Sequence, residues 1–516
     1  MSANPPRVPR ESIRDSTAER RAAVTGGDHE QEWAAAATAS LPRVWRRVAA
    51  ALVLATGLVR TAPPVHAESA YRLLAAGDLA ALTNRFEPGD VVLLPNATWT
   101  DTKLIFRGKG TPEKPITLRP GEPGRFTLAG QSSLTIDGEW LVVEGIQIKD
   151  AGVADSEGIV IKGRHNRLTA SVVDGSTHKY AVRLLGARHR VDHCYFAGKT
   201  SEGPTLQVEV DAREPNRHRI DFNHFGPRPP LGRNGGETIR VGYSFQSMYE
   251  SGTVVERNLF ERCDGEIEII SSKSGGNVYR GNTFRECAGM LTLRHGDRNV
   301  VDGNYFFGGG KKGSGGIRII GEDHVVTNNY IEGVDRGAFW ITAGVPNSEP
   351  HQYVTAKRAL IAFNTVVDSA GPYLDLAAGL GSAGRTLKPA GIVVAKNLFR
   401  LGDRGALVAG EEGDGWVWQG NAVHEASGSH AGIRQRQLTF NRDASGMLRL
   451  TSVVPPERVS LGSFPRVEFD IDGDPRGSSP ASGCDEPSTS HPILHPLMSE
   501  HVGPPWRIRP RGGNTL

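Results

Sequence analysis

One short phrase recurs along the chain: a few apolar or β-branched residues, then asparagine, one further residue, and Phe, Val or Ile. Clear copies are VVERNLF, VYRGNTF, VVDGNYF and VVTNNYI. The eight repeated asparagines lie 22 to 35 residues apart, and they are Asn223, Asn258, Asn282, Asn304, Asn329, Asn364, Asn397 and Asn421. A repeat of this length, made of short strands and Gly or Asn turns, predicts a solenoid, and inserts of about ten residues explain the longer intervals.

The repeat unit indicates which kind of solenoid to expect. Strand-like runs such as TVVE, EIEII and GIRII are three to six residues long and end near Gly, Asn or Asp. No long stretch shows the helical period of about 3.6 residues. We therefore predict an all-β protein, a right-handed parallel β-helix whose coils stack about 4.8 Å apart. The asparagines then form a ladder in which each buried side chain hydrogen-bonds its neighbours in adjacent coils.

The overall charge does not favour a nucleic-acid partner. The 60 Lys and Arg residues nearly balance the 57 Asp and Glu residues, which gives a net charge of +3. This balance excludes a polyanion-binding tail but allows a local basic groove. The 63 glycines suit a β protein that is rich in turns.

The N-terminal region carries the features of an export signal. Residues 48–59, VAAALVLATGLV, are the only long apolar run; three arginines precede it, and VHA ending at Ala67 fits a cleavage site. Because the run is short for a membrane span, we expect a cleaved signal peptide and a secreted or periplasmic protein without stable membrane insertion. An uncleaved anchor is the alternative.

These features divide the chain into three expected regions. Residues 1–67 form an N-terminal extension with the signal peptide, residues 68–480 form the β-helix, and residues 481–516 form a poorly ordered tail. Cleavage after Ala67 leaves 449 residues, enough for about ten coils with caps.

The cysteines do not indicate a zinc site, because none of them shows CxxC or Cys/His spacing. Cys263 and Cys287 lie 24 residues apart, which is one coil. Export permits a disulfide between them, and buried free thiols in the coil interior are the alternative.

Two glutamates form the sharpest candidate for a metal site. Glu266 and Glu268, within CDGEIEIISSKSGGN, are two positions apart on a predicted strand, so both carboxylates point to one face. Adjacent carboxylates repel unless a cation lies between them, and hard oxygen ligands suit Ca²⁺. A solvated strand face is the alternative, and the pair alone does not decide between the two.

A line of cations beside this pair favours the metal site. Lys273 is followed after 21 residues by Arg294 and after a further 24 by Arg318, so we expect the three to stack in successive coils along one face. A row of cations bordering an acidic metal site is costly unless an anionic ligand bridges them. An acidic polysaccharide, whose carboxylates follow the coils, is the partner that fits.

Four motifs together resemble a known family. The runs NGGETIRVG (234–242), GEIEIISSKS (265–274), LTLRHG (291–296) and SGGIRIIG (314–321) are similar to those of polysaccharide lyase family 6. That family includes alginate lyases and the dermatan-cleaving chondroitinase B. The resemblance covers about residues 70–480 and departs from the family in RGSSPASGCDEPS, near the end.

The resemblance implies a parallel β-helix and β-elimination at a uronic acid with Ca²⁺ bound. By this resemblance, the metal ligands are Asn234, Glu266 and Glu268, the Brønsted base is Lys273, the second catalytic residue is Arg294, and the substrate-contacting residues are His295 and Arg318.

β-Elimination explains why these residue types are needed. The reaction removes the proton beside a uronate carboxylate and expels the glycosidic oxygen, and Ca²⁺ on the carboxylate stabilises the developing charge. Ca²⁺ and Arg294 both disfavour the charged form of Lys273, which makes it available as the base. Because a guanidinium is a poor proton donor, we interpret Arg294 first as an electrostatic clamp. The acid role implied by the resemblance is the second interpretation, and water or His295 is another proton source.

We therefore expect an alginate lyase of the poly(β-D-mannuronate) lyase kind, acting on mannuronate-containing links. A dermatan or chondroitin B lyase with the same mechanism is the nearest alternative. Asp264, beside the two glutamates, also allows the paired carboxylates of a glycoside hydrolase. A non-catalytic β-helix adhesin that binds carbohydrate would not need Lys273 beside a metal site.

Overall fold

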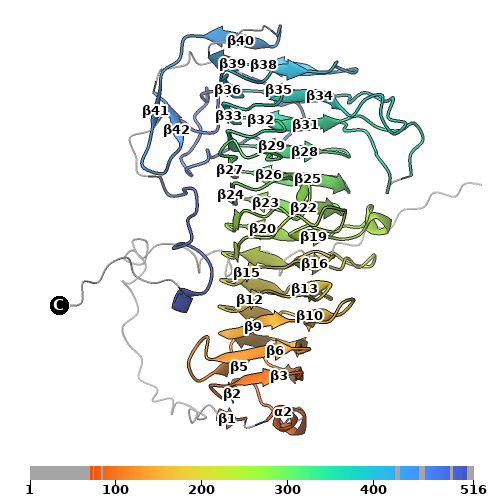
Figure 1. The fold of residues 1–516 in the computed structure, drawn as a ribbon. Helices are drawn as coiled ribbons and strands as arrows, with labels where there is room; N and C mark the ends of the chain where they lie inside the picture. Colours follow the sequence, from red (N-terminus) through yellow and green to blue (C-terminus); the bar gives the residue numbers. More distant parts are fainter. Residues whose placement is uncertain are drawn as a thin grey trace, which may run out of the picture. The chain divides into compact units, whose positions relative to one another are not determined.

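Three long parallel sheets wind into a column of stacked coils (Figure 1). The computed structural model describes residues 70–73, 75–82, 85–349, 351–424, 430–451, 459–487 and 492–507. Each full coil contributes one strand to each sheet, which is the parallel β-helix that the sequence predicts. The predicted N-terminal extension and signal peptide lie outside the described residues.

Each sheet takes every third strand of the coils. Sheet A contains β1 (Ala70–Arg72), β2 (Val91–Leu94), β5 (Ile116–Pro120), β8 (Leu141–Glu144), β11 (Arg167–Thr169), β14 (Arg190–Asp192), β17 (Arg219–Asp221), β20 (Val254–Glu256), β23 (Val278–Arg280), β26 (Val300–Asp302), β29 (Val325–Thr327), β32 (Leu360–Ala362), β35 (Val393–Ala395) and β38 (Val417–Gln419). Sheet B contains β3 (Thr98–Thr100), β6 (Phe126–Gly130), β9 (Ile146–Ala151), β12 (Val172–Asp174), β15 (Tyr195–Ala197), β18 (His224–Phe225), β21 (Leu259–Glu261), β24 (Thr283–Arg285), β27 (Tyr305–Phe307), β30 (Tyr330–Glu332), β33 (Thr365–Val367), β36 (Leu398–Arg400), β39 (Asn421–His424) and β40 (Ile433–Arg436). Sheet C contains β4 (Lys103–Lys109), β7 (Ser133–Glu139), β10 (Glu157–Arg164), β13 (Tyr180–Leu184), β16 (Leu206–Val208), β19 (Ile239–Val241), β22 (Glu268–Lys273), β25 (Met290–His295), β28 (Ile317–Ile319), β31 (Phe339–Thr342), β34 (Leu374–Ala378) and β37 (Val408–Ala409). The other elements are α2 (Ala76–Leu82), the 3₁₀ helices η2 (Ser244–Gln246) and η3 (Pro505–Arg507), and an antiparallel hairpin of β41 (Phe440–Arg442) and β42 (Leu448–Leu450).

The β-helix has more coils than the sequence predicts. Among the described residues, sheets A and B contain 14 strands each and sheet C contains 12, against about ten expected coils. The additional coils precede Asn223, where other residues occupy the ladder position. Ser171 Oγ there accepts the backbone N–H of Ile146, and Cys194 takes the place next to Asn223. The asparagine count therefore underestimates the number of coils.

The predicted asparagine ladder is confirmed. All eight asparagines are at most 1% exposed. From Asn223 to Asn397, each side-chain Nδ2 donates to Oδ1 of the next ladder asparagine at 2.9–3.0 Å, and the backbone N–H donates to the same oxygen. Each Nδ2 also donates to a backbone carbonyl, as Asn304 does to Tyr279 O at 2.9 Å. These shared bonds fix the register between neighbouring coils.

The residue before each ladder asparagine adopts a left-handed backbone. Gly281 and Gly303 do so with φ of 59° and 63°, and the non-glycine residues Arg257 and Phe363 with φ of 51° and 56°. This conformation costs a non-glycine residue roughly 1–2 kcal/mol, which the hydrogen bonds of the following buried asparagine offset. The turn bends the chain from sheet A into sheet B at the same place in every coil.

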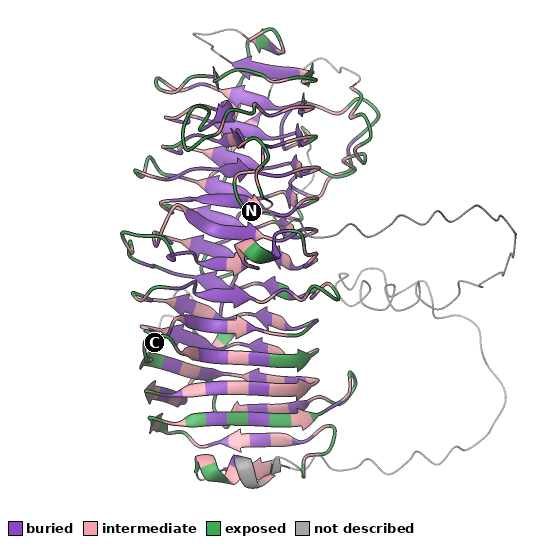
Figure 2. Ribbon diagram, turned by 90° about the vertical axis from the view of Figure 1, so that its right-hand side faces the viewer, coloured by how far each residue is buried: buried purple, intermediate pink, exposed green. Residues whose placement is uncertain are grey.

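Aromatic rings stack inside the coils two residues after the ladder. Phe225, Phe260, Phe284 and Phe306 have ring centroids 4.5–4.9 Å apart. Burial also differs along sheet C (Figure 2): β4 alternates between exposed and buried residues, whereas β22 is buried at five of its six positions. The residues of β22 are therefore shielded from solvent on both faces of sheet C, whereas β4 is exposed on its outer face.

A second polar ladder follows the corner between sheets C and A. The backbone N–H of Asn166 donates to His189 Nδ1 at 3.2 Å, and that of His189 donates to His218 Nδ1 at 3.0 Å. In later coils, Asn277 and Asn299 occupy this position, and the backbone N–H of Asn277 donates to Asn299 Oδ1 at 2.9 Å. A histidine replaces asparagine here only as a neutral imidazole, because its Nδ1 must accept a hydrogen bond. Burial lowers the pKa of His189 to about 4 and holds the pKa of His218 well below its usual value.

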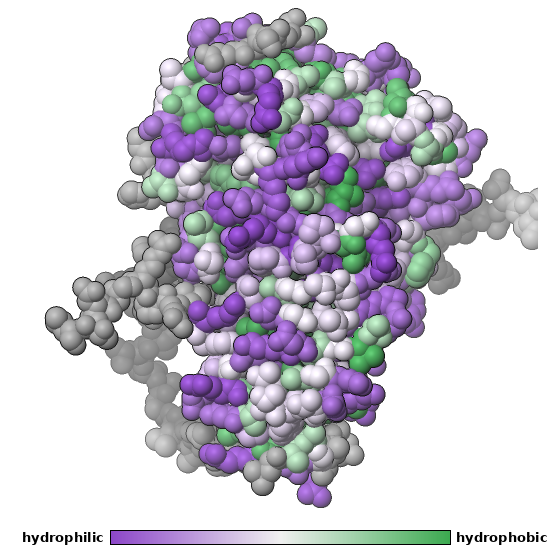
Figure 3. Space-filling model, viewed as in Figure 1, coloured by the Kyte–Doolittle hydropathy of each residue, from purple (hydrophilic) through white to green (hydrophobic). Residues whose placement is uncertain are grey.

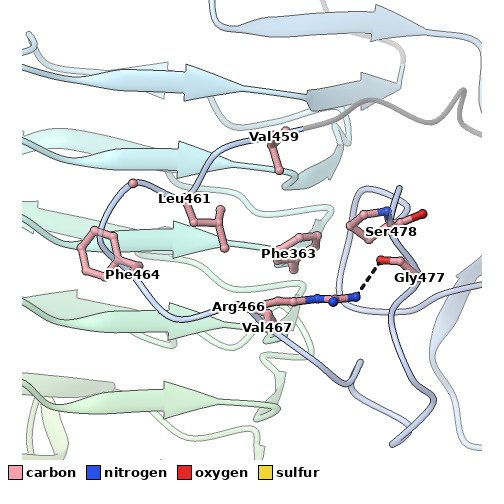
Figure 4. Close-up of a pocket in the computed structure, with 10 residues that line it drawn as sticks. Phe363, Val459, Leu461, Phe464, Arg466, Val467, Gly477 and Ser478 are labelled. Carbon is pink, nitrogen blue, oxygen red and sulfur yellow. Dashed lines mark hydrogen bonds between the residues drawn. The ribbon is translucent and has the colours of Figure 1, made fainter.

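After β40 the chain returns along the outside of the coils, whereas the predicted β-helix region continues to residue 480. Leu461, Phe464 and Val467 pack on Phe363 and its neighbours in sheet A. They border a cavity of about 490 Å³ (Figure 4). This segment is a strap on the β-helix and not a further coil.

The prediction of a poorly ordered tail at residues 481–516 is wrong for its described part. The backbone N–H of Leu497 donates to Thr283 Oγ1 at 2.8 Å, and Trp506 Nε1 donates to Ala170 O at 2.7 Å. The segment has no repeat in its sequence, but a few single side chains dock it onto coils that are already formed.

All four cysteines are buried free thiols. Cys287 Sγ accepts the backbone N–H of Cys263 at 3.3 Å, so the two lie in adjacent coils as their spacing predicts. Of the two alternatives for Cys263 and Cys287, the structure therefore shows buried free thiols and not a disulfide.

Hydrophilic and hydrophobic residues are mixed over the face shown in Figure 3. Among the described residues, no helix is long and apolar enough to cross a membrane.

We predict that acid destabilises the β-helix through its histidine ladder. The pKa of His189 is about 4 in the folded protein and 6.5 in its usual state, so its contribution is complete above pH 6.5 and is lost as the pH falls toward 4. For His189 alone, the free energy of unfolding falls by about 2 kcal/mol between pH 7 and pH 5. Thermal unfolding at these two pH values measures the effect as a lower melting temperature.

The matched variant is His189→Asn, which supplies the residue that Asn277 and Asn299 provide in later coils and does not titrate. Its melting temperature should fall less than that of the wild type between the two pH values. An equal fall in both proteins would contradict the role of His189.

Candidate active site

A cleft of about 760 Å³ lies on the outer face of sheet C, over β22, β25 and β28. Its lining includes six of the seven predicted site residues, namely Asn234, Glu266, Glu268, Lys273, Arg294 and Arg318. Residues that are up to 84 positions apart in the sequence thus meet in one place.

Three carboxylates gather at the acidic side of the cleft, two in its lining and one buried beside them. Glu268 begins β22, and Glu266 precedes it in the connecting segment. The third is Glu237, which was not among the predicted site residues although it lies within the motif NGGETIRVG. Glu237 is fully buried, and both Glu237 Oε2 and Glu266 Oε1 are buried without a hydrogen-bond partner.

The proximity of these carboxylates disfavours their charged forms. Burial, together with the charges of Glu237 and Glu268, raises the pKa of Glu266 to about 8, while Lys273 and a backbone hydrogen bond from Gly235 oppose the rise. Without a cation between them, the three groups would therefore not all be ionised at neutral pH.

Two glycines let the acidic segments lie directly against each other. A Cβ on Gly265 would lie 2.1 Å from Gly236 O, and a Cβ on Gly236 would lie 2.3 Å from Gly265 O. Only glycine permits this approach, which brings the segment of Asn234 beside that of Glu266.

The basic side of the cleft differs in register from the predicted stack of three cations. Lys273, Arg294 and Arg318 all line the cleft, but Lys273 pairs with His295, and Arg318 pairs with Thr292. A bulge in β25 leaves Arg294 without a partner in β22. Coil spacing alone could not reveal this bulge, which turns the guanidinium toward the loop above it.

His295 supports the cleft wall from behind. It is 2% exposed, its Nε2 lies 3.2 Å from Ser244 Oγ, and its Nδ1 lies 3.3 Å from Arg294 Nη1. Burial, with the charges of Arg294 and Lys273, lowers the pKa of His295 to about 2. The ring is therefore neutral, which argues against it as an imidazolium proton source. The substrate contact that the resemblance implies for His295 stays a prediction.

Tyr353, from the long connection between β31 and β32, holds Arg294 from above. The Arg294 Cζ lies 4.3 Å from the ring centroid of Tyr353, and Arg294 Nη1 donates to Gln352 O at 3.0 Å. Arg294 Nε also lies 3.8 Å from Glu268 Oε1. No local motif in the sequence indicates Tyr353, because it comes from an inserted loop.

Asp264 is engaged in a structural pair. Its Oδ2 lies 2.6 Å from Lys311 Nζ, and its Oδ1 accepts the backbone N–H of Ala288 at 2.9 Å. These bonds disfavour the glycoside hydrolase alternative, in which Asp264 would need to be available as an acid or base.

The donor set fits a hard cation such as Ca²⁺, although not as a cage of carboxylates alone. In the described part of the chain, no three His, Cys, Asp or Glu side chains converge to hold a metal ion. The predicted set combines the amide oxygen of Asn234 with the carboxylates of Glu266 and Glu268, all of which line the cleft. A divalent cation there would satisfy the unpartnered oxygen of Glu266 and offset the repulsion between the carboxylates.

Comparison with known proteins decides the family. A family model described as chondroitinase B matches residues 75–390. A solved mannuronic acid specific polysaccharide family 6 lyase from human gut microbiota is 32% identical, with 71% of this chain and 91% of that chain covered and a TM-score of 0.63. The chain belongs to polysaccharide lyase family 6. The resemblance found in the sequence motifs is thereby confirmed.

Two further family 6 structures share the fold. The alginate lyase AlyGC is 32% identical with a TM-score of 0.73, and the match covers 87% of this chain but only 59% of AlyGC. A family 6 polysaccharide lyase from Pseudopedobacter saltans is 23% identical with a TM-score of 0.66, over 86% of this chain and 100% of that chain. Comparison with curated proteins gave no match.

We predict that Ca²⁺ stabilises the protein after treatment with a chelator. At a free concentration 100 times Kd, the gain in free energy of unfolding is about 2.7 kcal/mol, which thermal unfolding detects without any substrate. Glu266→Gln should weaken the apparent affinity about tenfold or more, because it removes one anionic ligand.

The control is Glu113→Gln, which changes an exposed carboxylate outside the cleft and should respond to Ca²⁺ as the wild type does. A melting temperature that stays constant throughout a Ca²⁺ titration of the wild type would refute the metal assignment.

Proposed function

We propose that this protein is a secreted, Ca²⁺-dependent lyase that cleaves alginate by β-elimination at a uronic acid, acting on mannuronate-containing links. One observation carries the proposal: Lys273 and Arg294 share a single cleft with the acidic group. Lys273 Nζ lies 3.9 Å from Glu237 Oε1, and Arg294 Nε lies 3.8 Å from Glu268 Oε1. A substrate carboxylate bound among these groups lies within reach of both basic side chains.

The proposed proton transfer begins at Lys273. When bound by Asn234, Glu266 and Glu268, Ca²⁺ would offset the negative charge that develops on the uronate carboxylate. Lys273, in its uncharged form, takes the proton from the carbon beside this carboxylate. The electron pair of that C–H bond forms a C=C bond, and the glycosidic C–O bond one carbon further breaks. The leaving oxygen takes up a proton, so the reaction is balanced without water being added across the bond.

Arg294 serves as the clamp in this proposal. Its guanidinium is oriented by Gln352 O and by the ring of Tyr353, and it stabilises negative charge on the leaving oxygen. Water is our preferred proton source, with Arg294 itself as the second candidate. The buried His295 is neutral, and a neutral imidazole is too weak an acid for this step.

The substrate assignment rests on relatives. Two solved relatives with 32% identity are an alginate lyase and a mannuronic acid specific lyase. The alternative is a dermatan or chondroitin B lyase, which the description of the matching family model favours. Arg233, Lys312 and Arg336 also line the cleft and offer the cations that sulfate groups would require.

The proposed secretion rests on the N-terminal sequence. The apolar run 48–59, the arginines before it and the cleavage pattern ending at Ala67 support a secreted or periplasmic protein. A polymeric substrate outside the cell is consistent with this location.

We predict that the purified protein produces an unsaturated, ultraviolet-absorbing sugar end from polymannuronate more rapidly than from polyguluronate, dermatan sulfate or chondroitin. Activity on dermatan sulfate alone would establish the alternative lyase. Reducing ends without ultraviolet absorbance would indicate a hydrolase, and binding without either product would indicate an adhesin.

We predict that Lys273→Ala lowers kcat by about 10²- to 10⁴-fold, the usual contribution of a general base, while substrate binding is largely retained. The control is Lys149→Ala, which removes an exposed lysine outside the cleft and should leave turnover unchanged. Turnover by Lys273→Ala at the wild-type rate would exclude Lys273 as the base.

A further inference from the structure

Phe245 is an aromatic side chain left open to solvent at the edge of the cleft. It is 74% exposed and lies in η2, shortly after β19 in the middle of the column (Figure 1). Its neighbour Ser244 lines the cleft, and Ser244 Oγ lies 3.2 Å from His295 Nε2. Phe245 therefore follows directly in sequence a residue of the cleft wall, and that residue contacts the neighbour of Arg294.

The ring rests on a fixed support. The rings of Phe245 and Tyr243 are parallel within 10°, with centroids 5.3 Å apart. The Tyr243 hydroxyl donates to Glu209 Oε1 at 2.9 Å and lies 3.0 Å from Tyr180 Oη, and Arg240 Cζ lies 4.7 Å from the Tyr243 centroid. Phe245 thus offers a preformed flat apolar surface whose position is set by Tyr243 and the coils beneath it.

The two sides of the cleft differ in how they can hold an acidic chain. On the side of β28, the lining includes Lys312, Arg318 and Arg336. On the side of β19, the two arginines are already paired. Arg240 Nε donates to Gln207 Oε1 at 2.7 Å and its Nη1 lies 3.4 Å from Glu237 Oε1, while Arg233 Nη2 lies 3.1 Å from Glu202 Oε2. Charge attraction is therefore weaker on the side of β19, and apolar contact with Phe245 is the interaction that remains available to a sugar ring there.

We propose that Phe245, backed by Tyr243, is an outer sugar-binding subsite that takes the apolar C–H face of a pyranose ring in a uronate polysaccharide. The inference rests on the proposed function, since it places this sugar next to the uronate on which Lys273 acts. The subsite adds affinity for chains long enough to reach it. It leaves the chemical step unchanged, because Phe245 does not touch the reacting atoms.

The test compares the wild type with Phe245→Ala on polymannuronate and on mannuronate oligosaccharides of defined length. We expect KM for the polymer to rise about five- to tenfold with kcat nearly unchanged. KM for the shortest oligosaccharide that is cleaved should stay the same, because that chain does not reach Phe245. Phe245→Tyr should restore the wild-type KM, since it keeps the ring.

Met248→Ala is the matched control, because Met248 is 62% exposed just after η2 and is apolar without being flat; its KM should equal that of the wild type. An unchanged KM in Phe245→Ala, an equal rise for the shortest and longest substrates, or a loss confined to kcat would overturn the subsite.

Binding separates this inference from the proposed function. Calorimetric titration of polymannuronate into Lys273→Ala, with and without Phe245→Ala, measures the subsite in the absence of turnover. Weaker binding of the double variant supports the subsite even if the wild type cleaves none of the polymers, a result that would refute only the proposed function. Equal binding, or no binding by either protein, overturns the subsite.

Discussion

Asparagine side chains carry hydrogen bonds from coil to coil along one edge of the β-helix, and the rest of the structure depends on them. The ladder bonds stay at 2.9–3.0 Å while the number of residues in a coil varies from 22 to 35. Extra residues therefore loop outward instead of shifting the register. Two of the longest intervals, 223–258 and 329–364, supply the cleft-lining residues Asn234 and Tyr353 respectively. The regular coils thus form the scaffold, and the inserted residues contribute to the cleft on its surface.

The acidic side of the cleft also depends on buried cations beneath it. Arg228, which is 3% exposed, donates from Nη2 to Gly203 O at 2.8 Å and from Nη1 to Glu237 O. Lys199 lies in the preceding coil and donates from Nζ to His178 O at 2.6 Å. Burial and the charge of Arg228 lower the pKa of Lys199 to about 7. Because both groups bond backbone carbonyls, Arg228 holds the backbone at Glu237 and Lys199 holds the coil beneath it.

The parts of the structure that follow the repeat could be predicted from the sequence, and the parts built by insertions could not. The spacing of the asparagines gave the ladder and the coil edge, and the motifs around Glu266, Lys273 and Arg294 gave most of the cleft. The repeat marks only the eight coils from Asn223 onward, because Ser171 and Cys194 stand in the preceding coils where asparagine was sought. Sequence periodicity reports which residues recur, and it does not report substitutes that make the same bond with different atoms.

Contacts between segments that are distant in sequence could not be predicted for a different reason. Tyr353 contacts Arg294 across 58 intervening residues of coil and loop, and Trp506 reaches Ala170 from the C-terminal segment. Neither residue belongs to a repeat, so no periodic pattern marks it. The burial of His295 could not be predicted either, because it depends on neighbours that are far away in the sequence, such as Ser244.

The bulge at Arg294 shows how a departure from the repeat serves the proposed chemistry. If β22 and β25 kept a regular register, Arg294 would stand directly opposite Lys273, and two like charges at neighbouring positions of a sheet repel. The bulge places His295 opposite Lys273 instead, and burial keeps that ring neutral. Arg294 moves outward to Gln352 O and the ring of Tyr353. One inserted residue thus separates Arg294 from Lys273 along the sheet, while both side chains still line the same cleft.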